Sequence, residues 1–189
     1  MIKKVAKNGF YAGTFDFFHD GHAAVLKSAL KLFDSIVVGI GVNPIKNPIT
    51  ALEERVRIIK KFSAVILGGK EHRVSVEAYD APLVTAARLH KCNFIIRGLR
   101  NHDDFGDEML LASTNNSIEE AFDVLEEDRL ETVWIPKGLP ISSTLLKQVI
   151  LLNDPRWSDV FKKYVPPCIY SDLYPLAVRY RESVLSKKG

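Results

Sequence analysis

Residues 9–22 read Gly-Phe-Tyr-Ala-Gly-Thr-Phe-Asp-Phe-Phe-His-Asp-Gly-His, and this stretch decides the fold class. It opens with a short apolar run that ends at Gly13, as a buried strand ends at a turn. From His22 to Leu32, apolar residues recur at the spacing of a helix. The stretch therefore predicts a strand, a turn that carries two histidines, and a helix.

The same alternation continues along the chain. Apolar runs that are typical of further strands occupy residues 35–42, 73–79, 93–96 and 132–135. Patterns that are typical of helices occupy residues 52–59, 82–90, 103–122 and 142–151. We therefore expect an α/β fold, with a Rossmann-like, five-stranded parallel sheet, helices on both faces and a helical C-terminal extension at residues 153–189.

Two local patterns refine the helix boundaries. Thr50 lies three residues before Glu53, which is the spacing of a capping box at the start of the second helix. Residues 113–116 read Ser-Thr-Asn-Asn, which are poor helix formers and good turn formers. We therefore expect a break in the helix at 103–122.

The composition of this 189-residue chain is that of an ordinary globular protein, with 47% hydrophobic and 26% charged residues. It predicts one domain that spans residues 1–189. The formal net charge of +3 is too small and too dispersed to indicate a nucleic-acid partner. Such a charge suits a small anionic ligand.

Cysteines and apolar segments bear on location. Cys92 and Cys168 lack the close spacing of a zinc or redox pair, so we interpret them as reduced thiols, with a single long-range disulfide as the alternative. No apolar stretch approaches the roughly 20 residues of a membrane-spanning helix, and the first residues lack the apolar core of a signal peptide. We expect a cytoplasmic protein with no membrane partner.

His19 and His22 lie three residues apart, around Gly21, at the predicted start of a helix. On a first helical turn the two imidazoles can face one point, and the helix N-terminus adds backbone donors and a positive dipole end. Phosphate is the ligand that this arrangement favours. Two other interpretations are open at this point: unrelated loop residues, or a zinc site completed by Asp16 or Asp20.

The Gly-Thr-Phe-Asp sequence at residues 13–16, followed by His-x-Gly-His at residues 19–22, resembles the hallmark of the nucleotidyltransferase superfamily. Members of that superfamily join a nucleoside monophosphate to a phosphate or a carboxylate. Within it, the chain is most similar over nearly its whole length to the phosphopantetheine adenylyltransferase family. Three further segments carry this narrower resemblance: the loop with Lys46, Arg-Gly-Leu-Arg at residues 97–100 and Ile-Ser-Ser-Thr at residues 141–144.

Arg97 and Arg100 are the most discriminating part of the resemblance. Both follow the predicted fourth strand directly, and we expect Gly98 to let the backbone turn between them. Guanidinium groups are costly in a core but suit the binding of phosphates in two-point contacts.

The resemblance implies an enzyme that transfers the adenylyl group of ATP to 4′-phosphopantetheine, giving dephospho-coenzyme A and pyrophosphate. It implies catalytic roles for His22, Lys46 and Arg97. It assigns ATP binding to Thr14, Phe15, His19, His22, Gly98, Arg100, Glu108, Ser142, Ser143 and Thr144, and acceptor binding to Thr14, Lys46, Leu83 and Arg97. Mg²⁺ is the implied cofactor, held by substrate oxygens and water rather than by protein ligands, and the implied assembly is a homo-oligomer, a hexamer in the family.

Several positions depart from the family pattern. Ala12 and Phe17 replace the prolines that are usual in bacterial enzymes, Pro82 and Leu83 stand where two aliphatic residues usually touch the pantetheine arm, and residues 113–131 form a longer segment than usual. Two alternative functions follow. One is a cytidylyl- or adenylyltransferase with another phosphorylated acceptor, such as glycerol phosphate; the other is a non-catalytic sensor of nucleotides or coenzyme A.

Overall fold

The computed structural model describes residues 6–42, 48–99, 102–136, 138–139 and 141–187. Within this part of the chain, five strands form one sheet in which every neighbouring pair is parallel. In order across the sheet they are β3 (Val74–Tyr79), β2 (Ser35–Gly41), β1 (Asn8–Gly13), β4 (Phe94–Leu99) and β5 (Glu131–Pro136). The five-stranded parallel sheet predicted from the sequence is confirmed.

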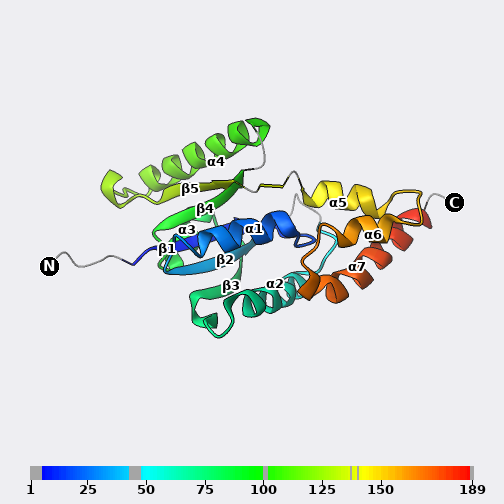
Figure 1. Cartoon of the computed structure of the whole chain (residues 1–189). Helices are drawn as coiled ribbons and strands as arrows, with labels where there is room; N and C mark the ends of the chain where they lie inside the picture. The colour runs from blue at the N-terminus through cyan, green and yellow to red at the C-terminus, as the bar shows by residue number, and fades with distance from the viewer. Residues whose placement is uncertain (1–5, 43–47, 100–101, 137, 140, 188–189) are drawn as a thin grey trace.

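Helices cover both faces of the sheet (Figure 1). One face carries α1 (Asp20–Ala29) and α2 (Leu52–Leu67), and the other carries α3 (Leu83–Leu89) and α4 (His102–Ala121). Beyond the carboxyl ends of the strands lie α5 (Ser143–Ile150), α6 (Trp157–Lys162) and α7 (Pro167–Leu185). Short 3-10 helices at Glu71–Arg73 and Glu126–Asp128 precede β3 and β5.

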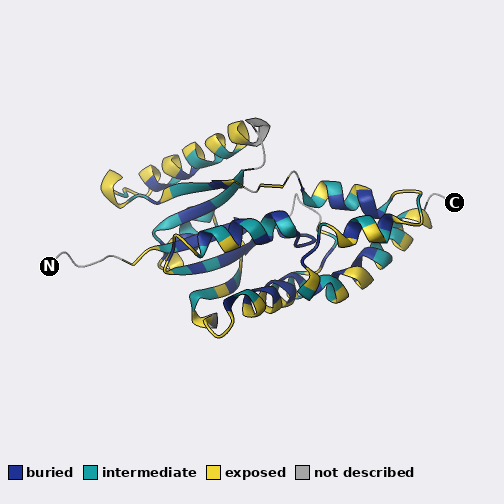
Figure 2. Ribbon diagram, in the orientation of Figure 1, coloured by how far each residue is buried: buried dark blue, intermediate teal, exposed yellow. Residues whose placement is uncertain are grey.

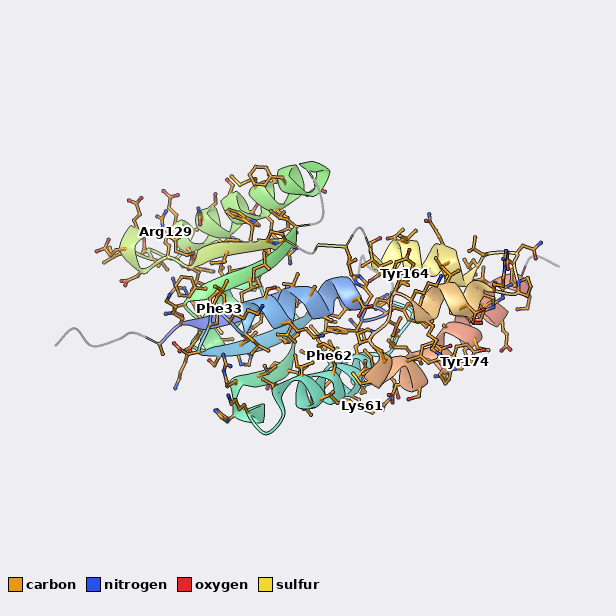
Figure 3. All side chains as sticks on the ribbon, viewed as in Figure 1. Phe33, Lys61, Phe62, Arg129, Tyr164 and Tyr174 are labelled. Atoms are coloured by element: carbon orange, nitrogen blue, oxygen red, sulfur yellow. The ribbon has the colours of Figure 1, made fainter. Side chains whose placement is uncertain are left out.

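The core lies on both sides of the central strands (Figure 2). Phe10, Val38 and Ile95 are fully buried. Phe62 of α2 lies between α2 and α1 (Figure 3), with its ring centroid 4.9 Å from that of Phe18. Cover on both faces is why these strands read as continuous apolar runs rather than as alternating patterns.

The turn between β1 and α1 is packed against the C-terminal helices. Phe15 and Phe17 have φ angles of 52° and 58°, in the left-handed region that side chains disfavour. Phe17 is fully buried, and its ring centroid lies 6.0 Å from that of Phe161 and 6.5 Å from that of Tyr180. The backbone N–H of Asp20 also donates to a carbonyl in the C-terminal segment. The C-terminal helices therefore hold this turn in place.

The expected break at Ser113–Asn116 is wrong, because α4 runs without interruption from His102 to Ala121. The hydroxyls of this region bond back to the preceding turn: Thr114 Oγ1 donates to the carbonyl of Leu110 at 2.8 Å, and Ser117 Oγ to the carbonyl of Ser113 at 3.1 Å. Asn115 is buried. The side chains that commonly form turns are thus absorbed within the helix.

The expected capping box of Thr50 and Glu53 is also wrong. Ala51 is the N-cap of α2 and makes no side-chain capping bond. Thr50 is instead buried before the helix, and its backbone N–H donates to Asp16 Oδ1. The tertiary contact with Asp16 sets the start of α2 in place of the local motif.

The two cysteines are free thiols, so the alternative of a disulfide is excluded. Burial raises the pKa of the Cys92 thiol to about 11, which keeps it protonated and unreactive. Among the described residues, none of the helices combines the length and apolar character that crossing a membrane requires.

Replacement of Phe161 by Ala tests the support of the β1–α1 turn by the C-terminal helices. Phe161 is fully buried against the rings of Phe17, Trp157 and Tyr170. We expect Phe161→Ala to lower the free energy of unfolding in urea by about 3–5 kcal/mol. Phe122 is 65% exposed, so Phe122→Ala should change stability by no more than about 0.5 kcal/mol. Equal effects of the two substitutions would contradict this packing.

Candidate active site

A pocket of about 750 Å³ lies at the carboxyl ends of the strands. Its volume is in the range of sites for small molecules. The strand order reverses between β1 and β4, which is where ligands of open α/β sheets bind. Its lining includes Tyr11–Asp16 at the end of β1, Gly41 of β2, Tyr79 of β3, Arg97 and Gly98 of β4, and residues at the start of α1, α4 and α5.

Most of the candidate site residues meet in this pocket. Its lining contains Thr14, Phe15, His19, His22, Leu83, Arg97, Gly98, Glu108, Ser142, Ser143 and Thr144. Lys46 and Arg100 lie outside the described residues. Residues that are far apart in the sequence therefore converge as the strand–helix pattern predicts.

The two histidines form a reciprocal cap at the start of α1. His19 is the N-cap, and its Nδ1 accepts a hydrogen bond from the backbone N–H of His22 at 3.3 Å. The Nδ1 of His22 accepts from the backbone N–H of His19 at 3.4 Å, and the two rings stack with centroids 3.7 Å apart. A neutral imidazole has one N–H, so with Nδ1 accepting, the proton of each ring is on Nε2. The motif thus supplies two Nε2–H donors.

A zinc site is not supported. The Nδ1 atoms of His19 and His22 accept backbone hydrogen bonds, and Asp16 accepts hydrogen bonds from the backbone and pairs with Lys147. In the part of the chain that the structure describes, no three His, Cys, Asp or Glu side chains are grouped to hold a metal ion. The histidine pair fits an anion better than a cation.

Arg97 and Glu108 form a two-point ion pair inside the pocket. Arg97 Nε donates to Glu108 Oε2 at 2.6 Å, and Nη2 donates to Oε1 at 2.7 Å. The remaining terminal nitrogen, Nη1, donates to the carbonyl of Ala12 at 3.0 Å. The guanidinium is thereby fixed against the end of β1, with its paired edge on Glu108.

The expectation that Arg97 and Gly98 lie beyond the fourth strand is wrong. Both belong to β4, where Arg97 pairs with Trp134 and Gly98 with Ile135 of β5. Gly98 makes no turn there, because pairing with β5 keeps the backbone extended to Leu99. The Arg97 side chain reaches the pocket from within the sheet.

The segment Ser142–Thr144 begins α5 at the rim of the pocket. Ser142 is the N-cap, and its Oγ accepts from the backbone N–H of Leu145 at 3.1 Å. This confirms the helix start predicted at Ser142. A helix N-terminus that points at a pocket provides donors for an anion.

Several pocket residues were absent from the candidates taken from the sequence. They are Tyr11, Ala12, Gly13, Gly41, Pro48, Tyr79, Asp107, Leu111 and Lys147, while Asp16 had been considered only as a zinc ligand. Lys147 could have been found from the sequence, because it follows Thr144 by three residues and so shares its helix face.

Burial raises the pKa of both Tyr11 and Tyr79, while the charge of Arg97 acts in the opposite sense. Both phenols therefore stay neutral at physiological pH.

The comparisons with known proteins agree with this geometry. Residues 10–149 match the model of the cytidylyltransferase-like family, so fold and site define a nucleotidyltransferase. A phosphopantetheine adenylyltransferase of Brucella anthropi is 37% identical over 166 residues, which cover 86% of this chain and 93% of the relative. Another, of Rhizobium etli, is 37% identical over 147 residues, 76% of this chain and 85% of the relative. The chain belongs to the phosphopantetheine adenylyltransferase family.

The architecture extends to more distant enzymes. The solved structure of Plasmodium falciparum nicotinic acid mononucleotide adenylyltransferase is similar, with a TM-score of 0.55 and 14% identity. The alignment covers 90% of this chain and 96% of that one. At this identity the similarity supports the fold alone.

Substitution of His19 tests the reciprocal cap. His19→Ala removes the acceptor for the backbone N–H of His22, so the free energy of unfolding should fall by about 1 kcal/mol. His19→Asn places an amide oxygen in a similar position and should restore most of this loss, since Asn is a good N-cap. Urea unfolding measures both. If Ala and Asn are equally stable, His19 does not cap α1.

Proposed function

We propose that this protein catalyses the transfer of the adenylyl group from ATP to 4′-phosphopantetheine, a step of coenzyme A biosynthesis. One observation carries the proposal: the motif residues that the chain shares with its family line a single pocket at the carboxyl ends of the strands. The relatives named phosphopantetheine adenylyltransferase, which match most of the chain, support the choice of both substrates.

The reaction needs positioning and charge stabilisation more than proton transfer. The nucleophile is a phosphate oxygen of the acceptor, which is already anionic at neutral pH. It forms a bond to the α-phosphorus of ATP while the bond to the bridging oxygen breaks, and pyrophosphate leaves with that electron pair. Groups that hold the two substrates in line and neutralise the crowded transition state supply the rate.

The histidine donors suit this transition state. In our proposal His22 Nε2–H donates to the oxygens of the α-phosphate as charge builds up there, and His19 Nε2–H binds the neighbouring phosphates of ATP. The cap at the start of α1 supports these roles, because it leaves the proton of each neutral ring on Nε2. His22 is then a hydrogen-bond donor and not a base.

The other ligands follow from the family and from their places in the pocket. Thr14 contacts the acceptor phosphate, and Leu83 the pantetheine arm; both line the pocket. Lys46 bridges the two reacting phosphates, and Arg100 binds the pyrophosphate side together with residues 142–144. Phe15 and Gly98 shape the ATP site by their backbone, since the Phe15 side chain is buried in the core.

Arg97 acts on the acceptor phosphate through a charge that Glu108 fixes in place. Its bonds to Glu108 and to Ala12 use three of the five N–H groups of the guanidinium. One N–H on each of the two terminal nitrogens is left to donate to the acceptor phosphate. Arg97 thus contributes to acceptor binding, and Glu108 keeps it oriented before binding.

We propose that Mg²⁺ enters as part of the ATP substrate. Of the carboxylates in the pocket, Asp16 is bonded to Lys147 and Glu108 to Arg97, while Asp107 is exposed. This donor set fits an ion held mainly by phosphate oxygens and water, where it neutralises charge on the triphosphate.

The hexamer and the cytoplasmic location implied by the family are also part of the proposal. Light scattering of the purified protein tests the hexamer.

An assay of pyrophosphate release tests the proposal. We expect pyrophosphate release from ATP and Mg²⁺ with 4′-phosphopantetheine. Release should be at least about 10²-fold lower when CTP replaces ATP, or when glycerol phosphate or nicotinamide mononucleotide replaces 4′-phosphopantetheine. The match to the cytidylyltransferase-like family makes CTP the essential control. Activity with another pair of nucleotide and acceptor would reassign the substrates. No pyrophosphate release with any pair would favour a nucleotide sensor.

Substitution of His22 separates its donor role from its capping role. His22→Asn keeps an acceptor near the position of Nδ1 but has no donor near that of Nε2, whereas Gln reaches that position with an amide N–H. We expect His22→Asn to lower kcat by about 10²–10³-fold with little change in the KM for ATP, and Gln to retain more activity. Steady-state kinetics measure both. Normal turnover of the Asn variant would refute the assigned role.

A further inference from the structure

Asp16 is a buried carboxylate that two distant segments hold from outside its own turn. The residue is 3% exposed. Oδ1 accepts from the backbone N–H of Ile49 at 3.1 Å and of Thr50 at 2.9 Å. Oδ2 accepts from the same N–H of Ile49 at 3.1 Å and pairs with Lys147 Nζ at 2.6 Å. Both oxygens are thus satisfied by the loop before α2 and by α5.

All three segments contribute to the wall of the pocket. The turn of Asp16 contains Thr14, the loop before α2 contributes Pro48, and α5 contributes Ser142–Thr144 and Lys147. Each of these segments starts from a different place in the fold, so nothing local sets the distances between them. Asp16 is the group at which they meet.

Arg55 fixes the same turn from below. It is buried on α2, and its Nη1 donates to the backbone carbonyl of Thr14 at 2.7 Å. Burial lowers the pKa of the Arg55 guanidinium, and the nearby charge of Asp16 acts in the opposite sense. The carboxylate therefore also offsets the charge of a second cation, which is buried beneath the turn.

A buried carboxylate is an expensive way to gain stability. Its desolvation often cancels the attraction of an ion pair, and well-packed apolar groups frequently serve stability as well. Unlike apolar groups, a carboxylate makes hydrogen bonds of defined direction. It fixes the positions of two backbone N–H groups and of the end of a flexible lysine at short range. That property is useful where groups from separate loops must keep their spacing.

We propose that Asp16 is a positioning residue for the transfer reaction. Its carboxylate holds the loop before α2 and the Lys147 ammonium at fixed distances from Thr14, so that the parts of the pocket wall that the three segments supply keep their spacing. The proposal rests on the proposed function, because alignment matters only where two phosphates must meet in line.

The Asp16→Asn variant tests this role. One oxygen remains for the two backbone N–H groups, but the amide nitrogen that replaces the other oxygen cannot accept from Lys147. We expect kcat to fall by about 10–100-fold at saturating substrates, with the KM of ATP raised no more than about threefold. Loss of a negative charge beside a triphosphate would, on electrostatics alone, lower the KM and leave kcat intact.

Asp172→Asn is the matched control. Asp172 on α7 pairs at 2.6 Å with both Arg57 and Lys61 of α2, and it does not line the pocket. Like Asp16, it is a carboxylate that joins segments distant in the sequence, but it does so through two cations of one helix. We expect Asp172→Asn to keep the kcat and both KM values of the parent protein, whatever its effect on the unfolding transition.

Two results would overturn the proposal. One is a folded Asp16→Asn variant with the kcat of the parent; the other is a loss of activity that follows the loss of folded protein and disappears on cooling. If Asp16→Asn does not fold, Lys147→Gln replaces it, since it removes the ion pair and leaves the backbone bonds. A higher KM for ATP with unchanged kcat would then make Lys147 an ordinary phosphate ligand and overturn the role of Asp16.

The parent protein decides the proposed function separately. Its pyrophosphate release is measured first with 4′-phosphopantetheine and with the other acceptors. If another pair of substrates is used, the proposed function fails, and the Asp16 variants are compared on that pair. The ratio of variant to parent kcat then still supports or overturns the positioning role. No pyrophosphate release by the parent protein with any pair of substrates overturns both proposals.

Discussion

The turn between β1 and α1 has to be held in a conformation that its own residues disfavour. Phe15 and Phe17 both adopt positive φ angles, which cost of order 1–3 kcal/mol each and persist only where the surroundings enforce them. The surroundings do so from three sides: the C-terminal helices bury Phe17, the loop before α2 and α5 hold Asp16, and the reciprocal cap fixes the histidines. The pocket takes its shape from this turn.

The same arrangement decides which chemistry the site supports. Its polar groups are mainly donors and cations that are fixed in advance, such as the capped His19 and His22 and the anchored Arg97, and the reaction asks for no base because its nucleophile is already charged. Donors that do not need to reorganise stabilise a developing negative charge best. The C-terminal helices are far in sequence from the turn that carries the histidines. They therefore contribute to the reaction indirectly, by holding the turn that they pack against.

The sheet could be predicted because it depends on short-range patterns, whereas most of the candidate residues of the pocket came from the resemblance to a family. Apolar runs mark strands that are covered on both faces, and the motif with His19 and His22 carries its own cap. The predictions were wrong where tertiary contacts override local rules. The backbone N–H of Thr50 donates to Asp16, and Thr50 forms no capping box. Pairing with β5 keeps the backbone of Gly98 extended. Lys147 was missed although its spacing from Thr144 places it on the same helix face, because its ion pair with Asp16 joins segments that are far apart in the sequence.

In the proposed reaction the site aligns two substrates for one direct displacement, without a covalent intermediate on the protein. The most direct test is the stereochemistry at the α-phosphorus, followed with one diastereomer of an ATP analogue that carries sulfur on that phosphate. A single in-line displacement predicts inversion of configuration in the dephospho-coenzyme A analogue. Retention would mean two successive displacements through an adenylylated side chain, and would rule out a single direct displacement.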